Sequence, residues 1–339
     1  FFFGRSQRRE RIIGQKSYDR LLKKPMAEYL AQDCSAVPEE YARLIQLFQH
    51  TNQAFPFEGN RIAVYTEGYT KLQSLLRELQ KAKQHIHMEY YIFEDDAIGR
   101  LVRDVLIEKA SQGVEVRVIY DDVGCWHVPN RFFEEMRNAG IEVRSFLKVR
   151  FPLFTSRVNY RNHRKIVVVD GRIGFVGGMN LAERYMRGFS WGIWRDTHIL
   201  IEGKAVHGLQ TAFLLDWYFV DRTLITASRY FPKIESCGNS LVQVVTSEPI
   251  GPWKEIMQGL TMAINGAKKY FYMQTPYFLP TEQVLAAMQT AALAGVDIRL
   301  MLPERADNRI THLGSHSYLR DVLQAGVKVY FYKKGFLHS

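Results

Sequence analysis

A histidine and a lysine that could act on a phosphate stand two residues apart near the middle of the chain. They begin a motif that reads His163-x-Lys165-x4-Asp170 and is followed by Gly-Gly-Met-Asn at 177–180. Residues 166–169 are all β-branched, which predicts a short strand that ends in an Asp-Gly turn. Because side chains two apart on a strand share a face, we expect His163 and Lys165 to point the same way. An imidazole beside a fixed ammonium suits attack on a phosphate, since the imidazole supplies the nucleophile and the ammonium holds the negative oxygens.

A surface strand with scattered charges is the alternative explanation of a lone His-x-Lys pair. It does not account for an aspartate at a fixed offset together with a Gly-Gly-x-Asn segment, so we favour a phosphate site. Gly177 and Gly178 would let the backbone come close to the phosphate, where a Cβ atom would intrude.

The rest of the chain predicts the sheet that would carry this strand. Two amphipathic helices are expected first, near 18–30 and 38–50. From Asn60 onwards, strand-like runs alternate with helical runs, and this alternation predicts an α/β fold with a largely parallel or mixed sheet. The expected strands are 62–65, 85–93, 114–120 and 141–146, and the expected helices between them are 69–83, 98–112 and 130–139.

The chain also repeats itself with a long period. Three ordered pairs of segments match at offsets of 182 to 186 residues: 82–93 with 267–278, 113–117 with 295–299, and 139–143 with 325–329. Such an offset indicates a duplication of a whole α/β unit and not a solenoid. The duplication places His338 where a second His-x-Lys should begin, and the chain stops one residue before the expected lysine. We therefore expect the natural protein to continue past Ser339.

Composition and charge limit the classes of protein to which the chain can belong. Its 339 residues, 47% of them hydrophobic, suffice for two domains with substantial cores. Lys and Arg number 45 against 35 Asp and Glu, and the net charge of +10 favours an anionic partner such as nucleic acid, an anionic bilayer or a phosphorylated substrate. The three cysteines are far apart, so neither a zinc site nor a disulfide framework is expected, and a reducing compartment fits.

The start of the chain has the composition of a membrane-proximal segment. No run of about 18 apolar residues predicts a transmembrane helix. Three phenylalanines at 1–3 followed by an arginine cluster at 5–11 are nevertheless typical of the cytoplasmic flank of such a helix. We expect the chain to begin just after a membrane anchor, with a tail that carries an accidental Phe triplet as the alternative. The expected domains are a membrane-proximal helical segment at 1–55, a first repeat with the motif at 56–235, and a second repeat at 236–339.

These motifs resemble those of the phospholipase D superfamily, whose hallmark is a pair of H-x-K-x4-D motifs. The resemblance covers about residues 60–339 and is specific for the first motif and partial for the second. Within the superfamily, the chain is similar to the bacterial cardiolipin synthases at 159–165, at 177–180, in Thr-Pro-Tyr-Phe at 275–278, and in Gly-Phe-Leu-His at 335–338. The resemblance implies the phospholipase D fold, in which two similar α/β repeats with mixed sheets pack around a shared active site.

The resemblance also implies a function and a place of action. It implies an enzyme that joins two phosphatidylglycerol molecules into cardiolipin and releases glycerol, at the bacterial inner membrane with the catalytic domain facing the cytoplasm. His163 would be the nucleophile that forms a phosphatidyl-histidine, and His338 would protonate the departing glycerol and then deprotonate the incoming hydroxyl. The two roles could be exchanged. Lys165 and Asn180 would hold the non-bridging oxygens, one by its charge and one by its amide.

Two aspartates complete the predicted site, which requires no metal and no cofactor. Asp170 sits at a turn, where a structural role is simpler than a catalytic one. Asp196 is the best acidic candidate to hold the second nitrogen of the nucleophilic histidine, with a surface carboxylate as the alternative. His85 and His87 share a strand face as two metal ligands would, but their counterparts in the second repeat are tyrosines, so a role in the core or in a cleft wall is favoured.

Other functions and partners remain open from the sequence. A loop with Arg150, Phe151, Phe154, Arg157 and Arg161 could rest on an anionic membrane or simply be solvated. A phosphodiesterase that hydrolyses lipid or nucleic acid would use the same chemistry, and a non-catalytic module that binds anionic lipid is a third hypothesis. The aromatic content and the Phe-rich start favour phosphatidylglycerol and an anionic membrane as partners over nucleic acid. A homo-oligomer stays open.

Overall fold

The computed structural model describes residues 15–31, 37–147, 161–247 and 253–338. The Phe-rich start and most of the basic and aromatic loop at 150–161 lie outside the described residues. Within the described ranges, no helix combines the length and the apolar character that a bilayer-spanning helix needs.

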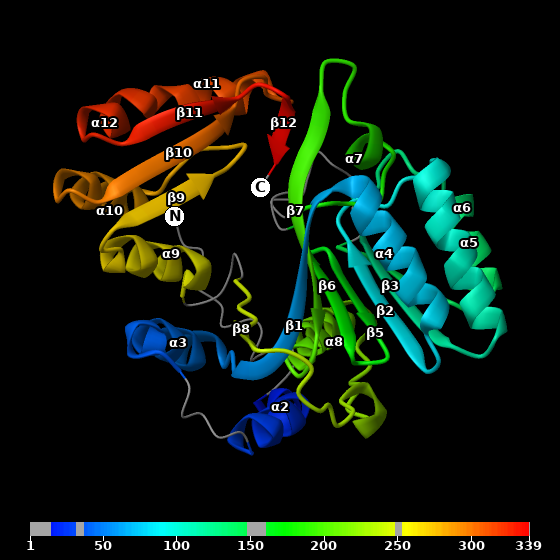
Figure 1. Ribbon diagram of the computed structural model, residues 1–339. Coiled ribbons are helices and arrows are strands. Elements are labelled where there is room, and N and C mark those ends of the chain that lie inside the picture. Colours follow the sequence, from blue (N-terminus) through cyan, green and yellow to red (C-terminus); the bar gives the residue numbers. More distant parts are fainter. Residues whose placement is uncertain (1–14, 32–36, 148–160, 248–252, 339) are drawn as a thin grey trace, which may run out of the picture.

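The larger of the two sheets in the described residues is a mixed sheet of nine strands (Figure 1). Its strands β2, β3 and β4 run parallel, and β5, β6, β7, β1 and β8 continue the sheet as antiparallel neighbours. The order is β4-β3-β2-β5-β6-β7-β1-β8, and β12 pairs with β7. These strands span Pro56–Glu67 (β1), His85–Tyr90 (β2), Glu115–Asp121 (β3), Glu142–Phe146 (β4), Ile166–Val169 (β5), Ile173–Gly177 (β6), Ile193–Glu202 (β7), Ser240–Gln243 (β8) and Gly335–His338 (β12). The α/β class with a mixed sheet is therefore confirmed.

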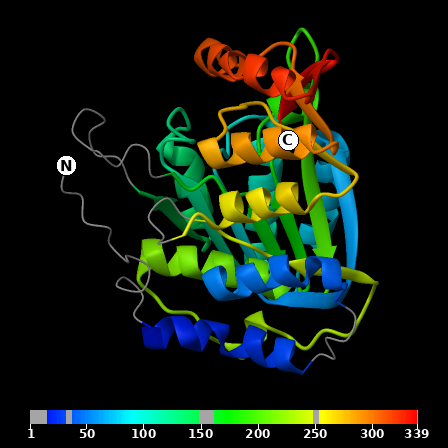
Figure 2. The same cartoon turned by 90° about the vertical axis from the view of Figure 1, so that its left-hand side faces the viewer.

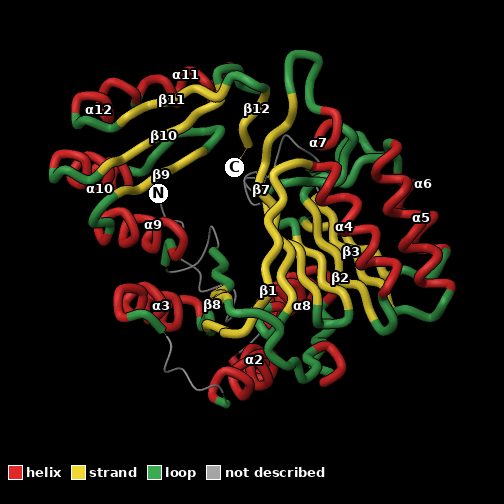
Figure 3. The backbone as a smooth tube through the Cα atoms, in the orientation of Figure 1, coloured by secondary structure: helices red, strands yellow, loops and turns green. Residues whose placement is uncertain are grey.

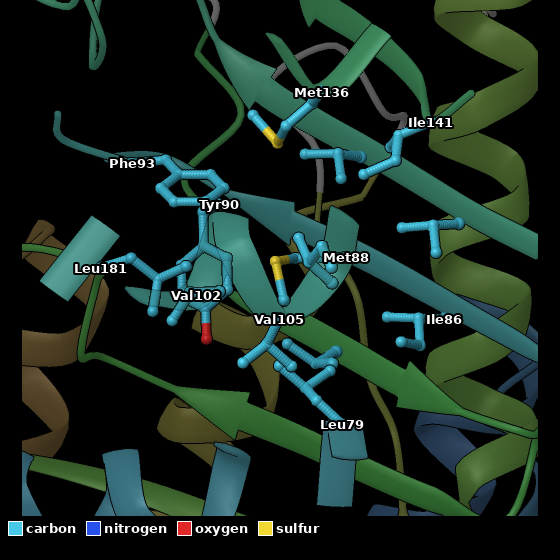
Figure 4. Packing of buried hydrophobic residues seen from close by; sticks show 14 of the residues in the cluster. Leu79, Ile86, Met88, Tyr90, Phe93, Val102, Val105, Met136, Ile141 and Leu181 are labelled. Carbon is cyan, nitrogen blue, oxygen red and sulfur yellow. The ribbon is translucent and has the colours of Figure 1, made fainter. Parts of the chain in front are cut away.

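Helices cover both faces of this sheet. On one face lie α4 (Gly68–Lys81), α5 (Ala97–Ser111) and α6 (Asn130–Asn138), and on the other lies α8 (Val206–Asp221). The sequence of α4 explains how the helix packs on the sheet, because Leu72, Leu75 and Leu79 recur at helical spacing and are all buried in the core. Figure 4 shows the core into which Leu79 inserts. Each such leucine contributes roughly 1.5–3 kcal/mol by leaving water.

A second, smaller sheet repeats part of the first. Its strands β9 (Tyr270–Gln274), β10 (Asp297–Pro303) and β11 (Lys328–Tyr332) run parallel in the order β11-β10-β9, which matches β4-β3-β2 (Figure 3). The predicted duplication is therefore visible in the order and direction of the strands. The helices α9 (Glu255–Gly266), α10 (Glu282–Leu293) and α12 (Leu319–Gln324) share one apolar core with this sheet, and α11 (Arg309–Ser317) precedes α12.

The repeats are joined more closely than two separate units would be. Both β8 and β12 lie within the predicted second repeat, yet each adds a strand to the first sheet. The helix α2 (Gln15–Leu30) packs on α8, and α3 (Glu39–Asn52) packs on α9 (Figure 2). At the second of these contacts, a Cβ atom at Gly259 would lie 2.1 Å from the Phe48 ring, so the glycine lets this ring pack directly against α9. The division at 55 and 235 remains a prediction.

Candidate active site

His163 and Lys165 share one site, although not for the reason that the sequence suggested. Both lie in the segment just before β5 and outside the strand, so strand alternation does not align them. Lys165 Nζ lies 3.0 Å from His163 Nδ1 and donates a hydrogen bond of 2.6 Å to the His163 carbonyl oxygen. The Tyr91 ring packs beside both, 4.6 Å from the His163 ring and 5.4 Å from Lys165 Nζ. The lysine folds back onto the histidine because it bonds that residue's own backbone.

Buried polar residues fix the segment on each side of His163. The Asn162 backbone N–H donates to Asp121 Oδ2 at 3.1 Å, and its side-chain amide donates to the buried Glu89. Arg164 forms an ion pair with Asp216 of α8. Burial and the neighbouring Asp216 raise the pKa of Glu89 well above its usual range, so Glu89 is held in its neutral form.

Glu89 and Asp216 escaped the sequence analysis, although one signal was available. Glu89 is the acidic residue of an otherwise strand-like run, and a carboxyl group on a strand that is buried on both faces needs a polar partner. That partner is Asn162, the residue before the motif histidine.

Burial and neighbouring charge perturb both motif side chains. Burial lowers the pKa of His163 to about 4, with further lowering by Lys165 and His338, so the imidazole is neutral at neutral pH even though part of the residue faces solvent. Burial lowers the pKa of Lys165 to about 7, and the carboxylates of Asp196 and Asp121 oppose this shift. The neutral imidazole has a lone pair for attack on phosphorus, and the ammonium form of Lys165 attracts the negative phosphate oxygens.

The second histidine reaches the site from the other repeat. Because β12 runs parallel to β7, it places His338 opposite Asp196 in the sheet register. His338 Nδ1 lies 2.8 Å from Asp196 Oδ2, and Asp196 is fully buried. The other carboxylate oxygen, Oδ1, accepts the Thr197 backbone N–H at 2.7 Å. A carboxylate can only accept, so Nδ1 of His338 carries a proton and Nε2 is left to exchange one.

The pairing corrects the expectation for Asp196. The sequence suggested that Asp196 holds the second nitrogen of His163, whereas the structure pairs it with His338. The reason is topological, because β12 of the second repeat completes the first sheet beside β7. Local spacing could not reveal this contact between strands far apart in the chain.

Gly177 and Gly178 each have a close neighbour within the protein, and the approach of their backbone to a phosphate stays a prediction. A Cβ atom at Gly178 would lie 2.0 Å from Asp196 Oδ1, and one at Gly177 would lie 2.5 Å from the backbone of His198. Both glycines therefore allow β7 to approach closely, and Gly178 lies against the aspartate that holds His338.

Asn180 and Asp170 also have partners within the protein. Asn180 is buried, its Oδ1 accepts the Ile92 N–H at 3.0 Å, and its Nδ2 donates to the Tyr185 hydroxyl at 2.6 Å. Asp170 lies at the end of β5 away from His163. It accepts three backbone N–H groups at 83–85 at 2.8 to 2.9 Å and adopts a left-handed φ of 52° at the predicted turn. The contacts of Asp170 are therefore those of a residue that orients the backbone.

His85 and His87 are buried in the core. Gln210 of α8 bridges them, at 3.2 Å to His85 Nε2 and 2.7 Å to His87 Nδ1. Burial lowers the pKa of both, so they are neutral. No group of three or more His, Cys, Asp or Glu side chains in the described part of the chain could hold a metal ion.

A duplicated α/β unit whose two halves bring one histidine each to a shared site defines the phospholipase D class of proteins. A family model for the phospholipase D-like domain of cardiolipin synthase matches residues 75–217 and 260–339. A cardiolipin synthase of Geobacillus sp. (strain WCH70) is 38% identical over 343 residues, which cover 99% of this chain and 68% of that protein. The chain therefore belongs to the family of cardiolipin synthases with a phospholipase D-like domain.

Further relatives agree on the family. A cardiolipin synthase of Geobacillus kaustophilus is 45% identical over 83% of this chain, and the major cardiolipin synthase of Bacillus subtilis is 42% identical over 87%. The chain spans 57% and 62% of the lengths of these two proteins. A crystal structure of phosphatidylserine synthase from Haemophilus influenzae has a TM-score of 0.60 and 14% identity, and it covers 87% of this chain and 79% of its own. This last similarity concerns the fold alone.

Proposed function

We propose that the protein transfers a phosphatidyl group from one phosphatidylglycerol molecule to another, giving cardiolipin and glycerol. The observation that carries the proposal is the meeting of His338, held by buried Asp196, with the His163–Lys165 pair from the other repeat. The names of the relatives supply the lipid product. Its partners are phosphatidylglycerol and an anionic bilayer, at the cytoplasmic side of the bacterial inner membrane.

The first half of the reaction uses one histidine as nucleophile and the other as acid. His163 Nε2 attacks phosphorus, a P–N bond forms, and the bond from phosphorus to the glycerol oxygen breaks. His338 gives its Nε2 proton to that oxygen, and glycerol departs. The phosphodiester negative charge needs stabilisation throughout, and Lys165 is the cation in reach of His163.

The second half reverses these proton movements. His338, now neutral, takes the proton from a hydroxyl of the second phosphatidylglycerol. Its oxygen attacks phosphorus, the P–N bond breaks, and cardiolipin is released with His163 restored. Buried Asp196 stabilises the imidazolium form of His338, which is present before the first half and again after the second.

The contact between Lys165 and His163 must change when the substrate binds. In its ammonium form Lys165 only donates, so it occupies the lone pair of His163 Nδ1 and leaves the ring proton on Nε2. Attack through Nε2 requires this proton to move to Nδ1, which requires Lys165 to leave Nδ1. A phosphate oxygen offers the ammonium a stronger acceptor, so binding of the substrate would itself free the nucleophile.

The full-length protein incubated with phosphatidylglycerol vesicles tests the proposal. We expect cardiolipin and glycerol in equal amounts, with no added metal or cofactor. Phosphatidic acid as the sole lipid product would replace transfer by hydrolysis, and unchanged lipid would overturn both. His163→Ala should abolish turnover and leave the folded state intact, whereas His50→Ala, at an exposed histidine in the last turn of α3, should keep full activity.

A further inference from the structure

Three aliphatic side chains stand exposed on and beside α11. Ile310 is 81% exposed, Leu313 is 69% exposed, and Leu279 of the loop before α10 is 51% exposed. Ile310 and Leu313 are three residues apart on a helix and so share a face. Leu279 belongs to the same patch, because a Cβ atom at Gly314 would lie 2.8 Å from its Cδ2. We call these three residues the α11 patch.

The α11 patch is tied to the catalytic histidine through Tyr277. The Tyr277 ring meets the His338 ring edge to face with centroids 6.3 Å apart, and Tyr277 is two residues from Leu279 in the chain. Its hydroxyl donates to Asp307 Oδ2 at 2.7 Å, two residues before α11 begins. Tyr277 therefore links the α11 patch to His338 through direct contacts.

Basic and aromatic side chains lie beside the α11 patch. Arg305 lies over the Trp191 ring at 5.9 Å, which joins the loop before α11 to the hairpin that leads into β7 and Asp196. Arg309 begins α11 and is exposed, and so is Arg305. Exposed aliphatic residues beside tryptophan and arginine have the composition of a surface that enters the headgroup layer of an anionic bilayer.

We propose that the α11 patch, with Arg305, Arg309 and Trp191, is the surface by which the protein docks on an anionic phospholipid bilayer during catalysis. The inference rests on the proposed function, because a lipid phosphate can reach His338 only if the mouth of the site meets the bilayer. The aliphatic side chains enter the acyl boundary and the arginines contact lipid phosphates. The headgroup then slides past Tyr277 to the two histidines.

A fluorescent reporter tests the docking independently of turnover. An environment-sensitive fluorophore is attached to Leu313→Cys in full-length protein with Cys34 and Cys237 replaced by serine. We expect a blue shift on phosphatidylglycerol vesicles that weakens with salt and is smaller on phosphatidylcholine. Leu293→Cys is the matched control, because Leu293 is 73% exposed but ends α10 near the start of β10, whereas α11 follows the other end of that strand. The absence of a blue shift at position 313, or an equal blue shift at positions 313 and 293, would overturn the proposal. The α11 patch would then bind a protein partner or no partner.

Turnover on two forms of substrate separates docking from chemistry. The variant Ile310→Gln/Leu313→Gln should lose at least about tenfold in activity on phosphatidylglycerol vesicles and keep its activity on short-chain phosphatidylglycerol dispersed as monomers. The matched control is Leu293→Gln/Leu323→Gln, which removes two exposed leucines elsewhere and should change neither activity. Equal losses on both substrates, or no loss on vesicles, would contradict docking by α11. A wild-type protein inactive on both substrates would contradict the proposed function alone, and the fluorescent reporter would still decide the docking.

Discussion

Replacement of Asp196 by asparagine should disable His338 while leaving its position almost unchanged. Asp196 Oδ1 accepts the Thr197 N–H at 2.7 Å, and Oδ2 accepts from His338 Nδ1 at 2.8 Å and from Trp194 Nε1 at 3.4 Å. Asparagine must place its NH₂ group at one of these two positions. Facing Thr197, it would set one buried donor against another, at a cost of about 1–3 kcal/mol. At the other position the NH₂ group meets only the longer contact of Trp194 Nε1, so the amide turns its NH₂ group to His338 Nδ1 and forces the ring proton onto Nε2.

The size of the effect follows from the lost proton acceptor. With Nε2 protonated and Nδ1 occupied, His338 cannot take the proton of the incoming hydroxyl, and no carboxylate stabilises its charged form. The corresponding change in a hydrolase triad, where aspartate also holds a histidine, lowers kcat about 10⁴-fold. We expect a loss of 10³- to 10⁴-fold here, which is about 4–5.5 kcal/mol of transition-state stabilisation.

The assay is glycerol release from phosphatidylglycerol vesicles, with thermal unfolding measured on the same samples. Asp196→Asn should lower kcat with little change in KM, because Asp196 acts through His338 and contacts no substrate in this scheme. The matched control is Asp104→Asn, at an exposed aspartate of α5 that pairs with Arg103, and it should keep wild-type kcat. A kcat for Asp196→Asn within tenfold of the wild type, in a folded protein, would refute the role given to the pair.

Three further changes probe the support of the site. Gly178→Ala should lower kcat at least about tenfold because the new Cβ atom, 2.0 Å from Asp196 Oδ1, must displace the carboxylate; Gly266→Ala, which meets nothing within 4 Å, is its control. Lys71→Met should stabilise the protein at pH 6, since burial lowers the pKa of Lys71 from 10.5 to about 7. The buried ammonium costs up to about 5 kcal/mol below pH 7, and this cost fades as the pH rises from 7 to 10.5, so urea unfolding should show the gain closing over that window. Asp170→Ala should destabilise by about 3 kcal/mol in the same assay, by freeing three backbone N–H groups, and leave the kcat of the folded enzyme unchanged.

The sequence predicted the elements well where periodicity alone decides them. The strand at 166–169 has the predicted bounds, and α5 and β3 differ by one residue at each end from their predicted ranges, because apolar spacing and turn residues mark both limits. The His163–Lys165 contact was anticipated although the two residues precede the strand, since a lysine two residues on can also fold back onto the histidine carbonyl.

Contacts between distant segments could not be predicted in the same way. The partner of Asp196 depends on β12 joining the first sheet beside β7, which no local pattern encodes. The reason for Gly178 depends in turn on Asp196. Glu89 and Asp216 act on the motif through Asn162 and Arg164. Their carboxyl groups become buried only when β2 and α8 are both in place, so the local sequence does not reveal them.

The covalent intermediate is the central claim, and trapping it tests that claim most directly. Full-length protein is mixed with phosphatidylglycerol labelled at phosphorus, denatured within the first turnover at alkaline pH, where phosphohistidine survives, and digested for peptide mapping. The proposed mechanism predicts label on the peptide that contains His163, and no label in His163→Ala. Label on the peptide that contains His338, or cardiolipin formed with label on neither histidine, would contradict the assignment.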